Sequence, residues 1–125
     1  MTSPRVLSIG QCFADHSAIA RTLQRHFAAE VVGADSPTEA LECLRQQHFD
    51  LVLVNRILDA DHSSGLEVIG QLKSADATQQ LPVMLVSNYD DAQQQAVDAG
   101  ALPGFGKSAL GHPAMLERVR AVLQA

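Results

Sequence analysis

The chain has 125 residues, of which 46% are hydrophobic and 18% charged, and its net charge is −5. This composition excludes global disorder, and the length fits one domain spanning residues 1–125. The nine Lys and Arg residues are scattered and outnumbered by fourteen Asp and Glu, which argues against nucleic acid as a partner.

Other segments exclude further classes of protein. No apolar run approaches the ~20 residues that a membrane-crossing helix needs, and residues 1–5 lack the apolar stretch of a signal peptide. Cys12 and Cys43 are isolated, without zinc-binding spacing, as expected for free thiols in a reducing compartment. We therefore expect a cytoplasmic protein that does not contact the membrane.

Short apolar runs alternate with helical patterns along the whole chain. In chain order, the patterns predict a strand at 5–9, a helix at 15–29, a strand at 30–34, a helix opening at Ser36-Pro37, a strand at 51–54, a helix opening at Ser64, a strand at 81–86, a helix from Asp90 or Asp91 to Gly100, a short edge strand at 101–105 and a last helix from Pro113.

Capping signals and apolar spacing define the helices. Ser36 with Glu39, and Ser64 with Glu67, form capping boxes, and Asp15 is expected to cap the first helix. The residues expected to face inward are Ile19, Leu23 and Phe27 in the first helix, Ala40, Leu41, Leu44 and His48 in the second, Leu66, Ile69 and Leu72 in the third, and Met115, Leu116, Val119, Val122 and Leu123 in the last. Phe13, next to Cys12, is expected to fold onto the core.

Strands that alternate with helices predict a parallel sheet covered on both faces. The runs 51–54 and 81–86 are apolar on both faces, as strands of such a sheet are. We predict a doubly wound α/β domain with five parallel strands in the order 2-1-3-4-5. Ligands of such folds bind at the carboxyl ends of the strands. The residues at those ends are Gly10, Gln11, Asn55, Arg56, Ser87, Asn88, Gly106 and Lys107.

Three segments carry a family resemblance. Residues 50–55 through 65–69 resemble the third strand and third helix of a response-regulator receiver domain, and residues 82–87 resemble its fourth strand with the switch Ser/Thr at Ser87. Gly100-Ala101 followed by Lys107 resembles its fifth strand and lysine. The resemblance covers nearly the whole chain and implies a flavodoxin-like fold and a role in bacterial two-component signal transduction.

The sequence departs from the family at the positions that carry its chemistry. Gly10-Gln11 stands where the family has two acidic residues, and Asn55 stands where it has the phosphoacceptor aspartate. Gly104 occupies the position of the switch aromatic residue, and the loop from Asn55 to Gly65 is about two residues longer than usual.

These departures predict that the usual phosphorylation cycle is absent. An amide nitrogen is not a nucleophile, and the carboxylates that would hold Mg²⁺ are missing at Gly10, Gln11 and Asn55. We expect a degenerate, atypical pocket formed by these three residues with Ser87 and Lys107, and neither metal, cofactor nor enzymatic activity. The histidines show no metal-binding spacing, and the serines show no G-x-S-x-G motif.

Two other functions remain open at the sequence level. Asp59 or Asp61 could replace the missing metal ligands in an orthodox receiver with a displaced acidic site. Alternatively, Lys107 without a carboxylate partner would favour an anion and make the pocket an anion or small-ligand sensor. Lys107 could also simply pair with Asp59 or Asp61, or point to solvent.

The favoured interpretation is a pseudo-receiver that acts by protein–protein interaction without phosphorylation. Family analogy places the partner surface on the strand at 101–105 and the helix at 113–123, with Ala101, Phe105 and Met115 as candidate contacts. The partner would be a second copy of the chain or a fused or adjacent signalling protein. Because the sequence ends soon after the last helix, we expect no DNA-binding output domain in it, and both a stand-alone module and a piece of a longer protein fit.

Overall fold

The computed structural model describes residues 3–124, which form a five-stranded sheet with helices on both sides. The strands are β1 (Arg5–Ile9), β2 (Glu30–Ala34), β3 (Leu51–Asn55), β4 (Val83–Val86) and β5 (Leu102–Phe105). The helices are α1 (Phe13–Phe27), α2 (Pro37–Gln46), α3 (Gly65–Ser74), α4 (Asp90–Asp98) and α5 (Pro113–Leu123), with a 3₁₀ turn at Lys107–Ala109. All neighbouring strands pair in parallel, in the order β2-β1-β3-β4-β5, which confirms the predicted topology.

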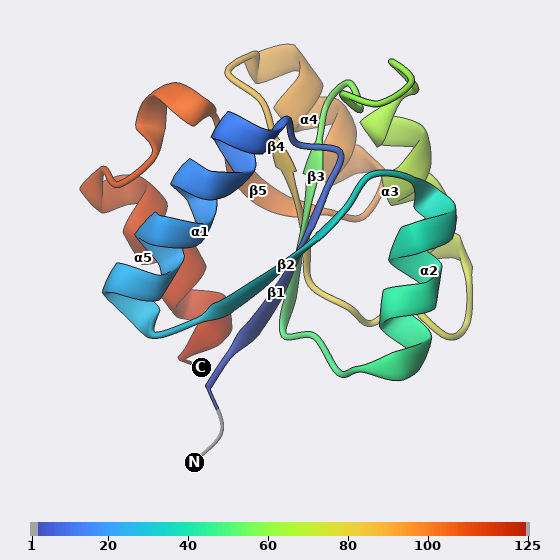
Figure 1. Ribbon diagram of the computed structural model, residues 1–125. Helices are drawn as coiled ribbons and strands as arrows, with labels where there is room; N and C mark the ends of the chain where they lie inside the picture. The colour runs from blue at the N-terminus through green and yellow to red at the C-terminus, as the bar shows by residue number, and fades with distance from the viewer. Residues whose placement is uncertain (1–2, 125) are drawn as a thin grey trace.

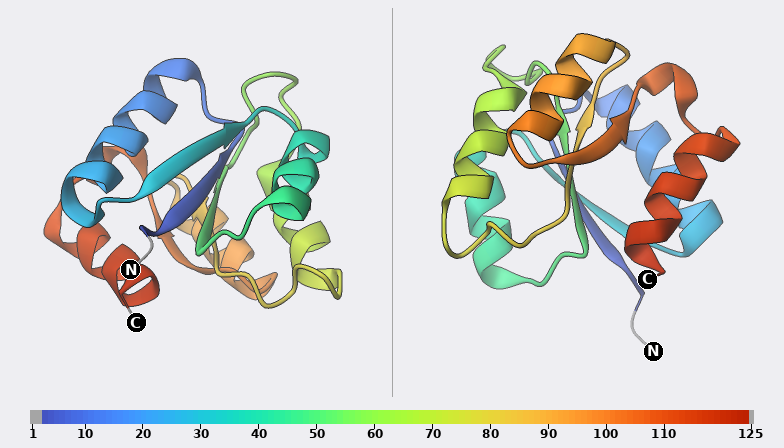
Figure 2. Two further views of the ribbon diagram at one scale, coloured as in Figure 1. Left: turned by 60° about the horizontal axis from the view of Figure 1, so that its bottom comes forward. Right: turned by 180° about the vertical axis from the view of Figure 1, so that it is seen from behind.

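The helices are divided between the two faces of the sheet (Figure 1). α1 and α5 cover one face and α2, α3 and α4 cover the other, as Figure 2 shows from two further sides. Each face has its own apolar cluster, with Leu53 and Met84 pointing toward α1 and α5, and Val54 and Leu85 pointing toward the opposite helices. Since successive strand residues point to opposite faces, a strand covered on both sides is apolar at every position.

The structure confirms two of the predicted helix caps. The Ser36 hydroxyl accepts a hydrogen bond from the Glu39 amide at 3.2 Å, and the Ser64 hydroxyl accepts one from the Glu67 amide at 3.3 Å. In α2, the Glu39 carboxylate reaches back to the Asp35 amide at 2.8 Å, so both directions of the capping box are satisfied.

The predicted caps of α4 and α1 are wrong. The N-cap position of α4 is occupied by Tyr89, whose side chain makes no capping hydrogen bond. Asp90 and Asp91 lie inside the first turn of the helix. The residue that precedes α1 is Cys12, so the helix begins at Phe13 and Asp15 falls in its first turn.

Three side chains are more exposed than predicted, two of them because of where the helices begin and end. Phe13 is 87% exposed rather than folded onto the core, since it starts α1 at the edge of the sheet. His48 lies beyond the end of α2 at Gln46 and is exposed, and Leu41, within α2, is 42% exposed. The helix α1 ends at Phe27 instead of Ala29 because Ala28 adopts a left-handed conformation with φ of 54°.

No helix within residues 3–124 combines the length and the apolar character that crossing a membrane requires.

Candidate functional site

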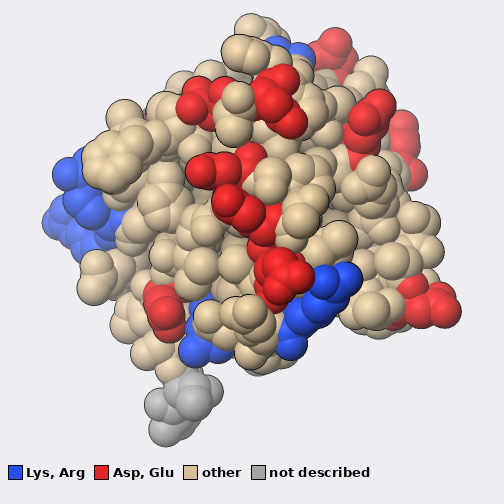
Figure 3. Space-filling view, turned by 45° about the vertical axis from the view of Figure 1, so that its right-hand side comes forward, with Lys and Arg blue, Asp and Glu red and all other residues tan. Residues whose placement is uncertain are grey.

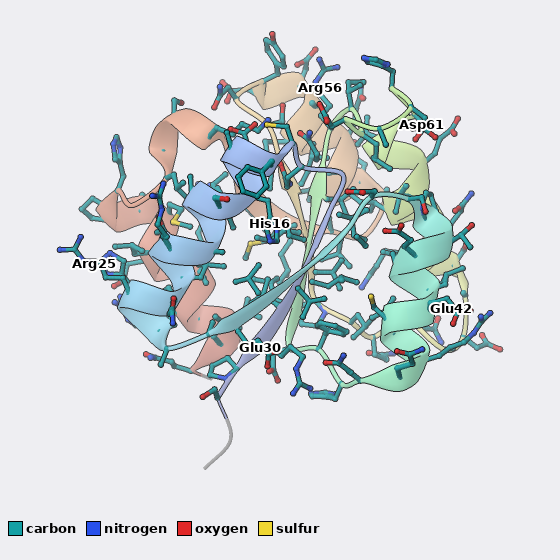
Figure 4. The ribbon with its side chains drawn as sticks, in the orientation of Figure 1. His16, Arg25, Glu30, Glu42, Arg56 and Asp61 are labelled. Carbon is teal, nitrogen blue, oxygen red and sulfur yellow. The ribbon has the colours of Figure 1, made fainter. Side chains whose placement is uncertain are left out.

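The carboxyl ends of three strands bring most of the predicted site residues together. Asn55 ends β3, Ser87 follows β4 and Lys107 follows β5, and they share a polar hollow of about 230 Å³. The hollow is lined by Asn55, Arg56, Ile57, Val86, Ser87, Asn88, Tyr89 and Lys107. Figure 4 shows Arg56 at this end of the sheet. The position agrees with the general rule for ligand sites in parallel sheets.

Asn55 is bound to the backbone beside it. Its side-chain Nδ2 donates a hydrogen bond to the Gly10 carbonyl at 3.0 Å, which joins the end of β3 to the end of β1. The amide therefore acts as a structural tie at the position where the family resemblance would place a phosphoacceptor carboxylate.

Gly10 has a backbone conformation that excludes an acidic side chain. Its φ is +78°, a value that residues with a Cβ rarely adopt. A Cβ built at this position would lie 2.4 Å from the Cγ of Leu58, in the loop between β3 and α3. The long loop after Asn55 thus occupies the space that a side chain at position 10 would need.

Gln11 lies apart from the hollow. The residue is only 7% exposed, and both polar atoms of its amide are buried without a hydrogen-bond partner among residues 3–124. Of the five residues predicted to form the pocket, the structure places Asn55, Ser87 and Lys107 around the hollow. Gly10 contacts Asn55 through its carbonyl, and neither Gly10 nor Gln11 lines the hollow.

Lys107 has a carboxylate partner that the sequence did not indicate. Its Nζ lies 2.7 Å from the Asp15 carboxylate, on the first turn of α1. The hydrogen bond from Lys107 lowers the pKa of Asp15, and a hydrogen bond from Cys12 adds to this effect. The predictions that Lys107 is unpaired, or pairs with Asp59 or Asp61, are wrong, because α1 starts early enough to bring Asp15 to this edge. Because the Asp15 carboxylate balances the positive charge of Lys107, the main argument for an anion-selective pocket no longer holds.

The rest of the hollow is closed by contacts among its own residues. The Arg56 guanidinium lies 4.9 Å from the centre of the Tyr89 ring, a cation–π contact. The Ser87 hydroxyl accepts a hydrogen bond from the Tyr89 amide at 3.1 Å. The Asn88 side-chain oxygen accepts bonds from the amide and the hydroxyl of Ser108.

These groups do not fit Mg²⁺, the metal ion that the family resemblance implies. Mg²⁺ prefers anionic oxygen ligands in octahedral geometry, whereas the hollow presents amides, a hydroxyl, a guanidinium and an ammonium. Asp59 and Asp61, the candidate replacements, are exposed, and the Asp61 carboxylate accepts a bond from the Ser63 amide at 2.9 Å. Figure 4 shows Asp61 on the outer side of its loop. Within residues 3–124, no three His, Cys, Asp or Glu side chains gather closely enough to hold a metal ion.

The side chains predicted as a partner surface belong to the core. Ala101, Phe105 and Met115 are 6%, 3% and 1% exposed, so they are not available for contact with another protein. The strand lies at the edge of the sheet as expected, but Phe105 at its end, Ala101 just before it and Met115 on α5 all point into the core. The exposed apolar side chains of the same region are Tyr89, Val97 and Leu102.

A glutamine on α4 ties β4 to β5. The Gln93 amide donates to the carbonyls of Leu85 and Ser87 at 2.9 and 3.1 Å, and it accepts from the Gly104 amide at 3.0 Å. β5 is irregular at this point, because its pairing with β4 shifts between Leu102 and Phe105. The bulge leaves the Gly104 backbone without ladder partners, and Gln93 and Arg118 supply them.

Gly104 has no room for the aromatic residue of the family pattern. A Cβ at this position would lie 2.1 Å from the Leu85 carbonyl oxygen and 3.0 Å from Oε1 of Gln93. The switch aromatic is therefore replaced by a polar clamp made by Gln93. In the α4 segment, the spacing of apolar residues gave no reason to prefer Gln93 over Gln94 or Gln95. The contact of Gln93 with β4 and β5 could therefore not be predicted from the sequence.

Comparisons with known proteins agree with the fold. Residues 13–120 match the family model of the response regulator receiver domain. The structure is similar to a response regulator from Thermotoga maritima, with 23% identity and a TM-score of 0.79, covering 99% of this chain and 100% of the other. It is also similar to the signal receiver domain of a DNA-binding response regulator from Colwellia psychrerythraea 34H, with 22% identity and a TM-score of 0.82, covering 98% and 99%.

A third similar structure was solved in a phosphorylated form. It is a response regulator protein from Burkholderia pseudomallei with a phosphorylated aspartic acid, a calcium ion and citrate, at 26% identity and a TM-score of 0.71, covering 98% of this chain and 67% of the other. No curated protein matches the chain.

Proposed function

The chain belongs to the response-regulator receiver family, and we propose that it is a pseudo-receiver that works without phosphorylation, through contact with a protein partner. The observation that carries this proposal is the hydrogen bond from Asn55 to the Gly10 carbonyl. At the position where the family resemblance places the phosphoacceptor, the side chain is an amide that donates a hydrogen bond to a backbone carbonyl. We assign it no enzymatic activity and place it in the cytoplasm of a bacterial cell.

The chemistry of phosphoryl transfer supports the proposal. Transfer to a receiver requires a carboxylate nucleophile and a metal ion that neutralises charge on the transferred group. Asn55 supplies no nucleophile, and Gly10 and Gln11 supply no anionic ligand. Lys107, which could stabilise the transferred group, is paired with Asp15.

The contacts of β5 support the second part of the proposal. Gln93 and Arg118 bind the Gly104 backbone from α4 and α5, so side chains hold β5 to both helices. Val97 and Leu102 are 36% and 39% exposed beside this clamp and offer apolar contact area to a partner. They replace the buried Ala101, Phe105 and Met115 as the residues that we assign to the partner surface.

Treatment with a small phosphoryl donor tests the absence of phosphorylation. We expect no mass increase when the wild-type chain is incubated with acetyl phosphate and Mg²⁺, and none with Asn55→Asp, because that variant restores one carboxylate but no metal ligand. The matched control is Asn88→Asp, which adds a carboxylate at the same edge of the sheet. Intact mass spectrometry measures the outcome.

An adduct of about 80 Da, the mass of one phosphoryl group, on the wild-type chain would contradict the proposal. If that adduct disappeared in Asp59→Asn or Asp61→Asn, the orthodox receiver with a displaced acidic site would be the correct interpretation. Rapid labelling of Asn55→Asp alone would show that the account of the metal ligands is wrong.

A further inference from the structure

A deep apolar groove separates α2 from α3. The two helices lie on the same face of the sheet, but α2 packs on β1 and β2, whereas α3 packs on β3, β4 and α4 (Figure 1). Between them remains a groove of about 520 Å³, within the range of sites that bind ligands and partner side chains. Its floor is formed by the core residues Phe49, Val68 and Leu72.

Small side chains keep the groove open. Ala40 lines it from α2, and Ala75 and Ala77 line it from the end of α3 and the turn that follows. Leu41 stands on the α2 side and is 42% exposed. The apolar lining and the exposed Leu41 together offer apolar contact area to the side chains of a partner.

The segment that builds the groove carries the whole net charge of the protein. Residues 35–82 contain eight acidic and three basic residues, which gives −5, while the rest of the chain has six of each and is neutral. Figure 3 shows acidic side chains spread over the middle of the face that α2 occupies, with one basic group directly beside them in its lower half and others farther out. Glu42 extends outward from α2 (Figure 4).

Two of the residues that line the groove, Arg45 and His48, each lie beside a carboxylate. Arg45 lies 3.0 Å from the Glu42 carboxylate, and His48 lies 3.2 Å from that of Asp50. The lining of the groove is mostly apolar and contains no Asp or Glu, and the exposed carboxylates beside it in the chain are Glu42, next to Leu41, and Asp76, between Ala75 and Ala77.

We propose that this groove binds a basic amphipathic helix of a partner protein. Such a helix would place apolar side chains at helical spacing between α2 and α3, and its Lys and Arg residues would face the exposed carboxylates beside the groove. The ten residues of α2 correspond to a length of about 15 Å, enough for about three turns of a bound helix. This inference does not depend on the proposed absence of phosphorylation, since the groove shares no residue with the polar hollow.

A pair of designed peptides tests the proposal. The first is an 18-residue amphipathic helix of Leu and Lys (about five turns), and the second has the same Leu positions with Glu in place of Lys. We expect the Lys peptide to bind, with chemical-shift changes centred on the amides of Leu41, Leu44 and Ala75. We expect the Glu peptide to bind at least about tenfold more weakly, a difference of about 1.4 kcal/mol.

Two variants fill the groove without disturbing the core. Ala75 and Ala77 are exposed, so Ala75→Phe and Ala77→Phe should fold normally and should each weaken binding of the Lys peptide. Ala114→Phe, at an exposed position on α5 outside the groove, is the matched control and should bind like the wild type. Equal binding of both peptides, equal affinities of Ala75→Phe and Ala114→Phe, or shifts confined to α1 or α4 would each overturn the proposal.

Discussion

Gln11 combines a polar side chain with almost complete burial. The two polar atoms of its amide contact no hydrogen-bond partner among the described residues, although burial has removed them from solvent. Leaving a buried polar group unsatisfied costs about 1–3 kcal/mol, so this position lowers the stability of the fold. The sequence suggested a pocket residue here, because the family places a carboxylate at the same position.

We expect Gln11→Met to raise the free energy of unfolding by about 1–3 kcal/mol, because methionine has a similar shape and needs no hydrogen bond. Urea denaturation followed by circular dichroism measures the change. Gln47→Met, at an exposed position, is the control and should alter stability by less than about 0.5 kcal/mol. A loss of stability in Gln11→Met would mean that the amide is satisfied in solution.

The ion pair of Lys107 and Asp15 makes a prediction about pH. Because Lys107 lowers the pKa of Asp15 below the ordinary value of 3.8, the charged carboxylate stabilises the folded state. This contribution is present above the pKa of the unfolded chain and is lost as the pH falls through the lower pKa of the folded chain.

We therefore expect Asp15→Asn to be less stable than the wild type at pH 7, with a difference that shrinks as the pH falls below about 4. Denaturant unfolding at a series of pH values measures it. Asp76→Asn, an exposed aspartate in the turn after α3, serves as the control and should follow the wild type across the whole range. A difference between Asp15→Asn and the wild type that is independent of pH would contradict the electrostatic explanation.

At the scale of the elements, β5 depends on side chains from two helices. Its bulge at Pro103-Gly104 interrupts the pairing with β4, and the Gln93 amide restores the hydrogen bonds that the ladder lacks. Arg118 binds the Gly104 carbonyl from the other side. The edge strand is thus joined to α4 and α5 by specific polar contacts in addition to its apolar packing.

Gln93→Leu should destabilise the protein by about 1–3 kcal/mol, because it leaves the Gly104 amide without an acceptor in a partly buried position. Hydrogen exchange of the Gly104 and Phe105 amides should accelerate in the same variant. Gln94→Leu is a close control, since Gln94 is exposed on the same helix and its side chain donates a hydrogen bond to the exposed Asp98 carboxylate. If both variants behaved alike, the clamp would have no role in holding β5.

Elements with strong local signals could be predicted from the sequence, and contacts between distant segments could not. The strands β3 and β4 follow from their continuous apolar character, although β4 begins at Val83 and not at residue 81 as predicted. The starts of α2 and α3 follow from Ser36 and Ser64. The start of α1 was misplaced because Cys12 leaves no capping signal, and this error concealed Asp15 as the partner of Lys107. The burial of Ala101 and Phe105 depends on α4 and α5 packing over β5, which local patterns do not encode.

On the whole molecule, three surface features of different chemistry lie on different elements. The polar hollow lies at the carboxyl edge of the sheet, the exposed Val97 and Leu102 lie near α4 and β5, and the apolar groove lies between α2 and α3. Because the groove and the β5 region are on different elements, a partner helix in the groove would leave Val97 and Leu102 free. Under the two proposals above, the domain would hold one partner at each of these surfaces.

The close packing of Leu58 against Gly10 bears on how this domain could regain phosphorylation. An aspartate at position 10 would have to adopt an unfavourable backbone conformation and displace the loop after β3. Such a substitution alone would be expected to destabilise the fold, and Asn55→Asp and Gln11→Asp would not relieve that clash. We therefore expect that an acidic residue at position 10 is tolerated only when the loop between β3 and α3 is shortened as well, so that single substitutions at this edge of the sheet cannot build a metal site.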